Sequence, residues 1–314
     1  MNFKRLDVLN KYKSIILLVV LSGIIAAINP RFLTVSNFLN ILRQTSVNAI
    51  IAAGMTFVIL TGGIDLSVGS ILAIVGAVAA SLIASGVSWF LVILIAILGG
   101  ALLGLVNGYI ITKGRVQPFI ATLATMTLLR GATLVYTDGK PISIGYAAGA
   151  ASFAGFGTGY FLGIPIPIHL SVIVFILAFY MLRQTRFGRY VYALGGNEEA
   201  TALSGINTKK IKAYVYGISG MLAALAGIII TARLSSAQPQ AGSGYELDAI
   251  AAVVLGGTSL SGGVGGIFGT IIGALIIGIL NNGLNLMNVS SYYQLLVKGV
   301  VILIAVLLDR KAKQ

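Results

Sequence analysis

The sequence predicts an all-α polytopic membrane protein with about ten transmembrane helices and broken helices near residues 61–70 and 256–266. Hydrophobic residues occupy 57% of the 314 positions and charged residues only 9%, whereas soluble domains carry about 25% charged residues. Apolar runs of about 20 residues, enough to cross a bilayer as a helix, recur along the chain. Half of the 40 glycines lie within these runs, where they let helices approach closely. Lipid must therefore solvate most of the surface.

The apolar runs expected to span the membrane follow one another with short connections. They lie near residues 14–29, 41–60, 68–86, 89–110, 116–136, 166–183, 213–232, 248–258, 267–286 and 290–309. The run at 248–258 is too short to span alone, so we expect it to be extended or half-broken. About nine or eleven spans would also fit the pattern. No polar segment is long enough to fold separately, so residues 1–314 are predicted to form a single transmembrane domain.

The N-terminal segment resembles a signal peptide, because Lys4, Arg5, Lys11 and Lys13 precede an apolar run. That run is longer than the usual signal-peptide core of about 7–15 residues, and further spans follow. An uncleaved first helix is therefore the favoured interpretation, and a cleaved signal peptide is the alternative.

Basic residues predict the orientation of the chain. With the N-terminus inside, most of the 21 Lys and Arg residues fall in cytoplasmic segments, and Arg31, Arg43, Lys140 and Arg233 fall outside. This is a positive-inside pattern, so both termini are predicted to be cytoplasmic. The same pattern explains the net charge of +13 without nucleic-acid binding. The same orientation places residues 138–165 on the external side. Their Gly, Ser, Pro and aromatic content indicates a short re-entrant or surface-lying cap.

Two glycine repeats indicate tight helix crossings. Glycines recur at every fourth position in two apolar runs, as Gly100, Gly104 and Gly108 and as Gly265, Gly269 and Gly273. Each set would line one face of a helix. Internal packing is the expected role, and helices that slide during a working cycle are the alternative.

The segment TGGIDLSVGS at 61–70 separates two apolar runs and contains Asp65. A carboxylate near hydrocarbon is costly, which makes it a functional candidate. The flanking glycines would break the helix, and the freed backbone groups must then be buried in protein or line a cavity. Asp65 and Ser67 are therefore candidates for a solute path. Alternatively, Asp65 caps the helix that begins at Leu66-Ser67.

The segment LGGTSLSGG at 255–263 has the same form, with an apolar run, a Gly-Gly pair and a hydroxyl-bearing turn. It predicts the second broken helix, with Thr258 and Ser259 as further path candidates. The similarity hints at an internal repeat, and it leaves open whether that repeat is inverted.

Polar residues also occur beside and within the predicted spans. Gln238, Gln240, Tyr245 and Glu246 lie in an external segment that could bind a polyol, receive a binding protein, or be an ordinary solvated loop. The polar residues within spans are Arg130, Asn281, Asn282, Asn285, Gln294 and Lys298. Interhelical hydrogen bonds are expected for most of them, and Asn281, Asn282 and Asn285 are kept as path candidates.

Residues 183–212 form the longest charged stretch, and the predicted orientation places them in the cytoplasm, where a soluble partner could bind. The sequence has no Walker loop, no His-Glu-x-x-His and no cysteine. No catalytic residue, metal site or cofactor is therefore expected in this chain. The energy for any work must come from a partner or from a gradient.

Within this stretch, residues 198–205 read EEATALSG. The spacing from Glu199 to Gly205 resembles the EAA loop of ABC importer permeases, the short cytoplasmic helix that docks onto the ATPase. The Leu-Pro that usually follows is missing, in agreement with the sugar-permease branch. The resemblance implies a coupling segment at about 184–212. Its contact residues would be Gly195, Gly196, Asn197, Glu198, Glu199, Ala200 and Gly205.

Longer segments carry a more specific resemblance. NILRQTSVNAI, ILTGGIDLSVGS, KGRVQPFIATL, GRYVYALGGNEEAT and GILNNGLNL resemble the permeases of bacterial ribose importers, within the sugar branch of binding-protein-dependent ABC permeases. The likeness runs from about residue 40 to the C-terminus.

The resemblance implies a multi-pass permease subunit in the bacterial cytoplasmic (inner) membrane that moves ribose or a similar monosaccharide. Implied partners are a second copy of the chain, membrane lipid, a periplasmic or lipid-anchored sugar-binding protein, and a cytoplasmic ATPase with two fused nucleotide-binding halves. That ATPase would bind ATP and Mg. The alternative is a gradient-driven sugar carrier or channel without an ATPase, which would need paired intramembrane acids where the chain offers mainly Asp65. An intramembrane enzyme is the least favoured alternative, because the chain lacks the pair of acids that such an enzyme would need.

Overall fold

The computed structural model describes the backbone of residues 3–311 and the side chains of residues 13–304 and Leu307. The long helices and the half-length helix α11 are α1 (Phe3–Ile28), α2 (Val35–Leu60), α3 (Val68–Ala84), α4 (Trp89–Gly114), α5 (Pro118–Thr137), α7 (Ile166–Gln184), α10 (Thr208–Leu234), α11 (Tyr245–Leu255), α12 (Ile267–Leu286) and α13 (Ser291–Lys311). Each apolar run predicted from the sequence coincides with one of these helices, which confirms the all-α class.

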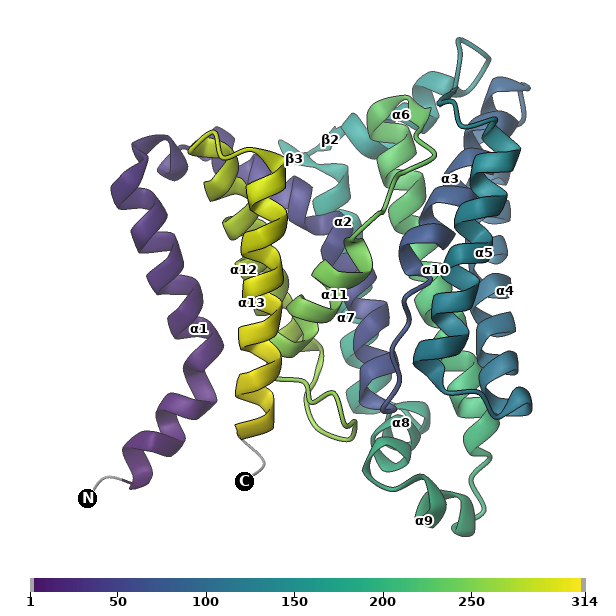
Figure 1. Cartoon of the computed structure of the whole chain (residues 1–314). Helices are drawn as coiled ribbons and strands as arrows, with labels where there is room; N and C mark the ends of the chain where they lie inside the picture. The colour runs from purple at the N-terminus through teal and green to yellow at the C-terminus, as the bar shows by residue number, and fades with distance from the viewer. Residues whose placement is uncertain (1–2, 312–314) are drawn as a thin grey trace.

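Short elements join the helices at the two ends of the bundle. They are η1 (Pro30–Leu33), α6 (Ala150–Thr158), α8 (Arg186–Gly196), α9 (Glu198–Leu203), β1 (Ile142–Ser143), β2 (Tyr160–Phe161), β3 (Ile164–Pro165) and β4 (Ser236–Ala237). β1 pairs antiparallel with β4, and β2 with β3. The segment expected to form a cap thus contains α6 and a small hairpin, and it lies across the helix ends (Figure 1).

Six helices within residues 3–311 are long and apolar enough to cross a membrane, namely α2, α4, α5, α7, α10 and α12. Shorter apolar helical stretches lie at Lys13–Ile28, Val68–Ala84 and Ser291–Ile304. The run at 248–258 belongs to α11, a helix of 11 residues, which agrees with a half-broken span. The structure is therefore that of a polytopic membrane protein.

The bundle has two distinct ends. α8 and α9 lie at one end, which we call the α9 end, and α1 begins and α13 ends there as well (Figure 1). η1, α6 and the β2–β3 hairpin lie at the opposite end, which we call the α6 end (Figure 1).

Two helix-to-coil units run in opposite directions through the bundle. α2 descends to the α9 end, and residues 61–67 return without helix before α3 begins inside the bundle (Figure 1). α10 ascends to the α6 end, and residues 235–244 return inward before α11 begins. Gly242 of the second return segment lies against Gly69 in the first turn of α3, since a Cβ on Gly242 would lie 2.6 Å from the Gly69 carbonyl oxygen. The units are therefore arranged as an inverted pair.

This pairing differs from the similarity between residues 61–70 and 255–263. The first segment follows the long helix α2, whereas the second follows the short helix α11 and precedes the long helix α12. The two segments therefore do not occupy equivalent positions of the inverted pair. Their similar composition reflects a shared requirement for a tight turn at the α9 end.

Helix α5 satisfies backbone groups of both return segments. The Thr122 hydroxyl donates to the carbonyl oxygen of Ile64 at 3.1 Å. The Arg130 guanidinium donates to the carbonyl oxygens of Pro239 and Ala241 at 2.8 and 2.9 Å. Non-helical backbone away from water needs such donors. Arg130 therefore forms internal hydrogen bonds, as expected for most polar residues within the spans, but its partners are backbone atoms of a return segment rather than another helix.

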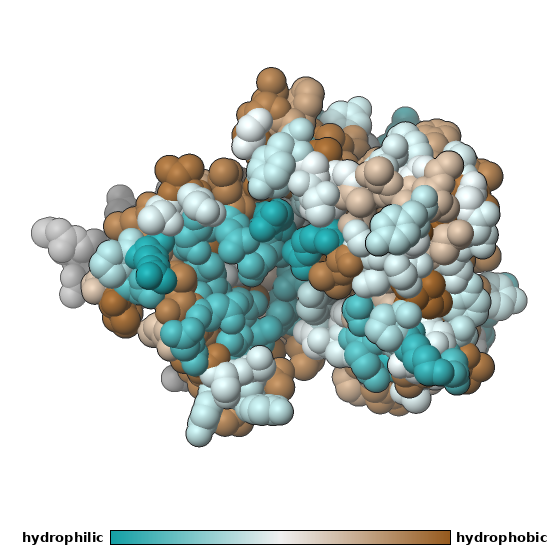
Figure 2. Space-filling model, turned by 90° about the horizontal axis from the view of Figure 1, so that it is seen from above, coloured by the Kyte–Doolittle hydropathy of each residue, from teal (hydrophilic) through white to brown (hydrophobic). Residues whose placement is uncertain are grey.

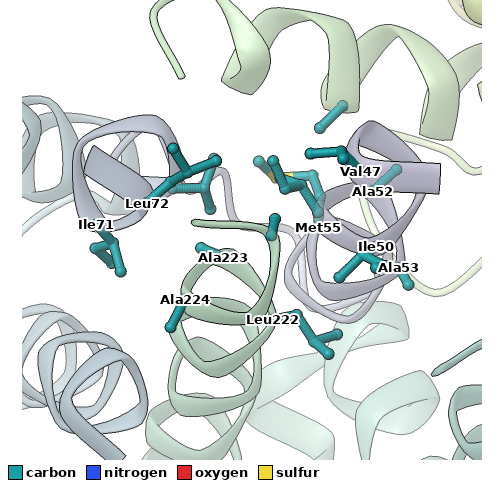
Figure 3. Packing of buried hydrophobic residues seen from close by; sticks show 14 of the residues in the cluster. Val47, Ile50, Ala52, Ala53, Met55, Ile71, Leu72, Leu222, Ala223 and Ala224 are labelled. Carbon is teal, nitrogen blue, oxygen red and sulfur yellow. The ribbon is translucent and has the colours of Figure 1, made fainter. Parts of the chain in front are cut away.

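Buried hydrophobic side chains pack together where α2, α3 and α10 meet. Figure 3 shows Leu72 from α3 and Met55 from α2 on facing sides of the space above α10, whereas Leu222 of α10 lies on the side of α2, and all three are buried. Small side chains on α10 let the three helices approach closely.

The first glycine repeat lies at the crossing of α4 with α10, as expected for internal packing. A Cβ on Gly104 would overlap the Tyr216 carbonyl oxygen, and a Cβ on Gly220 would lie 3.0 Å from the Gly104 Cα. The expectation for the second repeat was wrong in one respect. Gly265 precedes α12 and has a φ of +126°, so only Gly269 and Gly273 lie on that helix, where both pack against the end of α11.

The α4–α10 crossing gives a stability prediction with an internal control. Gly104→Ala should lower the free energy of unfolding by about 1–3 kcal/mol, because the added methyl group meets backbone that cannot yield. Gly99→Ala is the matched control on the same helix, since a Cβ there meets nothing within 4 Å. Thermal unfolding in detergent measures the midpoint temperature of each purified variant. Equal midpoints for the two variants would contradict this packing account.

Candidate functional site

A polar cavity of about 400 Å³ opens among α2, α11, α12 and α13. Its lining residues are Asn40, Arg43, Gln44, Thr45, Val47, Asn48, Arg233, Tyr245, Asp248, Ala274, Gly278, Asn281, Asn285, Gln294 and Lys298. Seen from the α6 end, hydrophilic side chains gather in a hollow of the surface (Figure 2). The chain therefore places a group of amides and charges inside an otherwise apolar bundle.

Helical spacing explains why these residues meet. Asn40, Gln44 and Asn48 recur at every fourth position of α2, as do Asn281 and Asn285 on α12. Residues four apart lie on one face of a helix. Gln294 and Lys298 repeat the same spacing on α13. Three helices therefore each present one polar stripe to the same cavity.

Hydrogen bonds connect these stripes. The Lys298 ammonium group lies 2.9 Å from Asp248 Oδ2, and the Asn48 amide donates to the same oxygen at 3.3 Å. The Gln294 amide donates to Asn285 Oδ1 at 2.9 Å. These contacts tie α13 to α11 and to α12, while Asn48 ties α2 to α11.

Two buried polar atoms at the cavity have no hydrogen-bond partner among the described residues, Asn281 Oδ1 and Thr45 Oγ1. Buried polar atoms are normally satisfied by protein or by a bound molecule. An amide oxygen accepts from a hydroxyl group, and a threonine hydroxyl can donate or accept. The cavity therefore offers unused hydrogen-bonding capacity suited to a polyhydroxylated solute.

A second cavity of about 540 Å³ lies next to the first, toward η1 and the β2–β3 hairpin. Asn40 and Arg43 line both cavities, and Arg31 and Tyr160 line the second. The two cavities therefore adjoin at the α6 end.

The predicted path residues lie in three different places. Asn281 and Asn285 line the polar cavity. Asn282 instead pairs with Asn37 through reciprocal amide hydrogen bonds of 3.1 and 2.9 Å. The remaining four, Asp65, Ser67, Thr258 and Ser259, lie in the two turns that follow α2 and α11.

Asp65 is fully buried in a network of polar side chains. Its Oδ1 accepts from the Ser67 amide at 3.0 Å and the Ser67 hydroxyl at 2.6 Å, and its Oδ2 accepts from the Ser219 hydroxyl at 2.8 Å. The Asn107 amide donates to Ser67 Oγ at 2.8 Å. Asp65 thus bonds to the residue that precedes α3, rather than capping the helix directly, and it links the return segment to α10.

Thr258 and Ser259 hold the loop between α11 and α12. Thr258 Oγ1 accepts from the Gly266 amide at 3.3 Å, and the Ser259 amide donates to the Val264 carbonyl oxygen at 3.0 Å. These contacts fix a compact loop that reaches the α9 end.

Several cavity residues were missed from the sequence. Asn40 lies on α2 just before the predicted span at 41–60, and Arg43, Gln44 and Asn48 lie within that span but were not selected. Asp248, Arg233 and Lys298 were likewise not selected as site residues. The segment NILRQTSVN could have revealed these residues, because Asn40, Gln44 and Asn48 are spaced four residues apart and so lie on one helical face.

The residues proposed to receive a binding protein differ in exposure. Gln240 is exposed, whereas Gln238 and Glu246 are half-buried. Tyr245 lines the polar cavity. Glu246 accepts from the Gly244 amide at 3.2 Å and faces Gly69.

The charged stretch folds into α8 and α9 at the α9 end. Asn197 ends α8, and its side chain caps α9 by accepting from the Ala200 amide at 2.9 Å. Glu198 pairs with Lys212 of α10 at 2.6 Å. Glu199, Ala200 and Gly205 are exposed, and Leu203 is 84% exposed. α9 therefore presents an exposed leucine and carboxylates beyond the bundle.

Helix α8 contacts both turns at once through a small group that we call the glycine junction, made of Gly195, Leu60 and Gly263. The Gly263 amide donates to the Leu60 carbonyl oxygen at 3.0 Å. A Cβ on Gly195 would overlap that oxygen and lie 2.5 Å from the Gly263 nitrogen. The turn after α2, the loop after α11 and α8 thus meet with no room for a side chain.

Tyr192 adds a second link from α8 to the loop after α11. Its hydroxyl donates to the Gly265 carbonyl oxygen at 3.0 Å. Burial raises the pKa of the Tyr192 phenol, and nearby Arg183 partly opposes that shift. A raised pKa keeps the phenol protonated at neutral pH, as this donor role requires.

The chain is similar to known permeases over nearly its full length. Residues 37–306 match the family described as branched-chain amino acid transport system / permease component. The chain is 62% identical over 308 residues to the ribose import permease protein of Haemophilus influenzae, covering 98% of this chain and 95% of that protein. It is 59% identical over 295 residues to the ribose import permease protein of Bacillus subtilis, covering 94% and 91%.

A more distant relative is the D-allose transport system permease protein of Escherichia coli, 44% identical over 303 residues, covering 96% and 92%. No solved structure matches the chain significantly. The family supports an ABC importer permease rather than a gradient-driven carrier, with ATP hydrolysis in a separate subunit. The chain belongs to the branched-chain amino acid transport system / permease component family.

Proposed function

We propose that this permease carries ribose or a closely similar monosaccharide through the polar cavity, by alternating access driven by an ATPase partner. The observation that carries the proposal is the cavity of about 400 Å³ lined by amides from three helices. A neutral sugar presents hydroxyl groups that both donate and accept. Arg43 and Gln44 offer donors, and Asn281 Oδ1 is a buried acceptor without a partner among the described residues.

Relatives support ribose as the first sugar to test. The proteins at 62% and 59% identity are named as ribose import permeases, and the one at 44% as a D-allose permease. Cavity chemistry alone does not distinguish these sugars, since each presents only hydroxyl groups and a ring oxygen. The choice of ribose therefore rests on the relatives.

The proposed topology is one membrane domain with about ten spans in the bacterial inner membrane, with both termini and the α9 end in the cytoplasm. Basic residues support this orientation, because Lys113, Arg115, Arg183 and Arg186 lie at or beyond helix ends near α8 and α9. The α6 end, with both polar cavities, would then face the side from which sugar arrives.

The proposed assembly contains two copies of this chain, an ATPase with two fused nucleotide-binding halves and a periplasmic or lipid-anchored sugar-binding protein. ATP and Mg would bind only in the ATPase. The exposed face of α9 is the proposed docking site for that ATPase, and Gln238, Gln240, Tyr245 and Glu246 remain the proposed region for the binding protein, where Gln240 is the exposed one.

The glycine junction provides a route by which ATPase motion at the α9 end is coupled to sugar movement in the polar cavity. A displacement of α8 by the ATPase would move Leu60 and Gly263 together, since both touch Gly195. Leu60 ends α2 and Gly263 precedes α12, and these two helices carry most of the cavity amides. Motion at the α9 end would thereby reach the walls of the sugar cavity.

The cavity assignment predicts the effect of Asn281→Leu. The KM for sugar uptake should rise by about threefold to tenfold, because a lost hydrogen bond costs about 0.5–1.5 kcal/mol. Thermal stability should not fall, since the change removes a buried acceptor without a described partner. Thr127→Val on the exposed face of α5 is the control. An unchanged KM in Asn281→Leu would remove Asn281 from the path.

Docking on α9 predicts loss of the ATPase from a purified complex. Leu203→Ser and Glu199→Lys should each reduce co-purification of the ATPase and sugar uptake, because both side chains are exposed on α9. Glu198 is a poorer choice, since its removal also breaks the pair with Lys212. Leu234→Ser removes an exposed leucine at the other end of α10 and should leave the complex intact. Full ATPase recovery with both α9 variants would reject this docking site.

The glycine junction predicts an uncoupled variant. Gly195→Ala should lower sugar uptake per ATP hydrolysed by at least about fivefold, the effect of about 1 kcal/mol of lost coupling. Gly131→Ala on α5 is the control, because it also adds a methyl group to a helical glycine and a Cβ there meets nothing within 4 Å. Uptake and ATP hydrolysis are measured together in proteoliposomes. Equal ratios in the two variants would show that the close contact carries no coupling.

A further inference from the structure

The charges that line the polar cavities are strongly unbalanced. Arg43, Arg233 and Lys298 line the first cavity, and Asp248 is the one carboxylate among its described lining residues. The adjoining cavity is lined by Arg31 and again by Arg43, with no acid in its described lining. A neutral monosaccharide has no charge for these residues to balance, so the excess of cations calls for a separate explanation.

Asp248 is already compensated within the protein. It is only 3% exposed, and Oδ2 lies 2.9 Å from the Lys298 ammonium group and accepts from the Asn48 amide. The remaining charge in the first cavity therefore belongs to the two arginines.

Arg43 and Arg233 have no carboxylate partner among the described side chains. The ion pairs found there join Lys140 to Asp138, Lys212 to Glu198 and Lys298 to Asp248. The hydrogen bond of Arg43 goes to the neutral Asn40 side chain at 3.1 Å. Glu246, the nearest acid in sequence to the cavity residue Asp248, faces Gly69 and interacts with Arg130.

A fixed positive charge beside a narrow aqueous cavity in a membrane protein repels small cations strongly, because the surrounding dielectric is low. It leaves a neutral solute nearly unaffected. Membrane pores use arginine in this way to exclude protons and other cations. Cation exclusion is needed in a membrane whose inside is negative, because the membrane potential would drive cations inward each time the path opened.

We propose that Arg43 and Arg233 form an electrostatic barrier that keeps small cations out of the cavity while a neutral sugar passes. The inference rests on the proposed role of this cavity as the sugar path. It adds a selectivity function that hydrogen bonding to sugar does not supply. Charge, rather than the shape of the side chain, is the property that matters.

The test uses the complete importer in proteoliposomes, with binding protein and sugar outside and ATP supplied to the ATPase. Radioactive rubidium ions outside the vesicles report cation entry, expressed per ATP hydrolysed. Arg43→Gln and Arg233→Gln, combined, should raise rubidium entry by roughly tenfold over wild type during turnover. Without ATP, entry should remain low, because the barrier matters only when the path opens.

Matched variants separate charge from other effects. Arg43→Lys with Arg233→Lys retains both charges and should keep rubidium entry at the wild-type level. Lys140→Gln removes one exposed positive charge outside both cavities and should also match wild type. If the lysine variant admits as much rubidium as the glutamine variant, shape rather than charge excludes cations and the proposal fails.

Wild-type rubidium entry in a glutamine variant that still hydrolyses ATP and imports sugar would also overturn the barrier. If the glutamine variant does not assemble, the same comparison is made with Arg233→Gln alone, set against Arg233→Lys. The KM of Asn281→Leu tests separately whether the cavity is the sugar path. An altered KM there, with normal cation exclusion in the arginine variants, would reject only the barrier.

Discussion

The glycine junction is the contact on which the rest of the structure depends. At this point the end of α2, the loop before α12 and helix α8 approach without a side chain between them, and the Gly263 amide bonds to the Leu60 carbonyl oxygen. A packed interior transmits displacement because it has no space to absorb it. Helix α8, at the α9 end, is thus rigidly connected to α2 and α12, the two helices that carry most of the cavity amides.

Breaking two helices inside a membrane protein requires that their backbone groups find other partners. Thr122 and Arg130 of α5 supply donors to the two return segments, and the buried Asp65 network ties the first segment to α10. These residues carry charge or polarity within spans, yet they serve the fold. The residues suited to meeting a solute are instead the amides and arginines that border the cavity, where hydrogen-bonding capacity remains unused.

Periodicity and composition were enough to predict the helices, because a span needs only a long apolar run. They were less informative about the site, since it is assembled from one stripe on each of three helices far apart in the chain. Asn281 and Asn285 could be found as amides in an apolar run, but Asn40 and Arg43 lay at the margin of a predicted span. Asp65 drew attention by its charge, although its partners Ser219 and Asn107 come from α10 and α4. No local pattern reveals such long-range contacts, and the position of Gly195 against two distant turns is of the same kind.

The most direct test of coupling between the α9 end and the cavity is the accessibility of a single cysteine in the cavity wall. The chain has no native cysteine, so Asn285→Cys provides a unique thiol in the complete importer. Its rate of modification by a membrane-impermeant thiol reagent, added on the side of the binding protein, is measured with and without a non-hydrolysable ATP analogue, and with excess ribose. We predict a rate that changes with the nucleotide and is reduced by ribose. A rate that is the same in all three conditions would contradict the account.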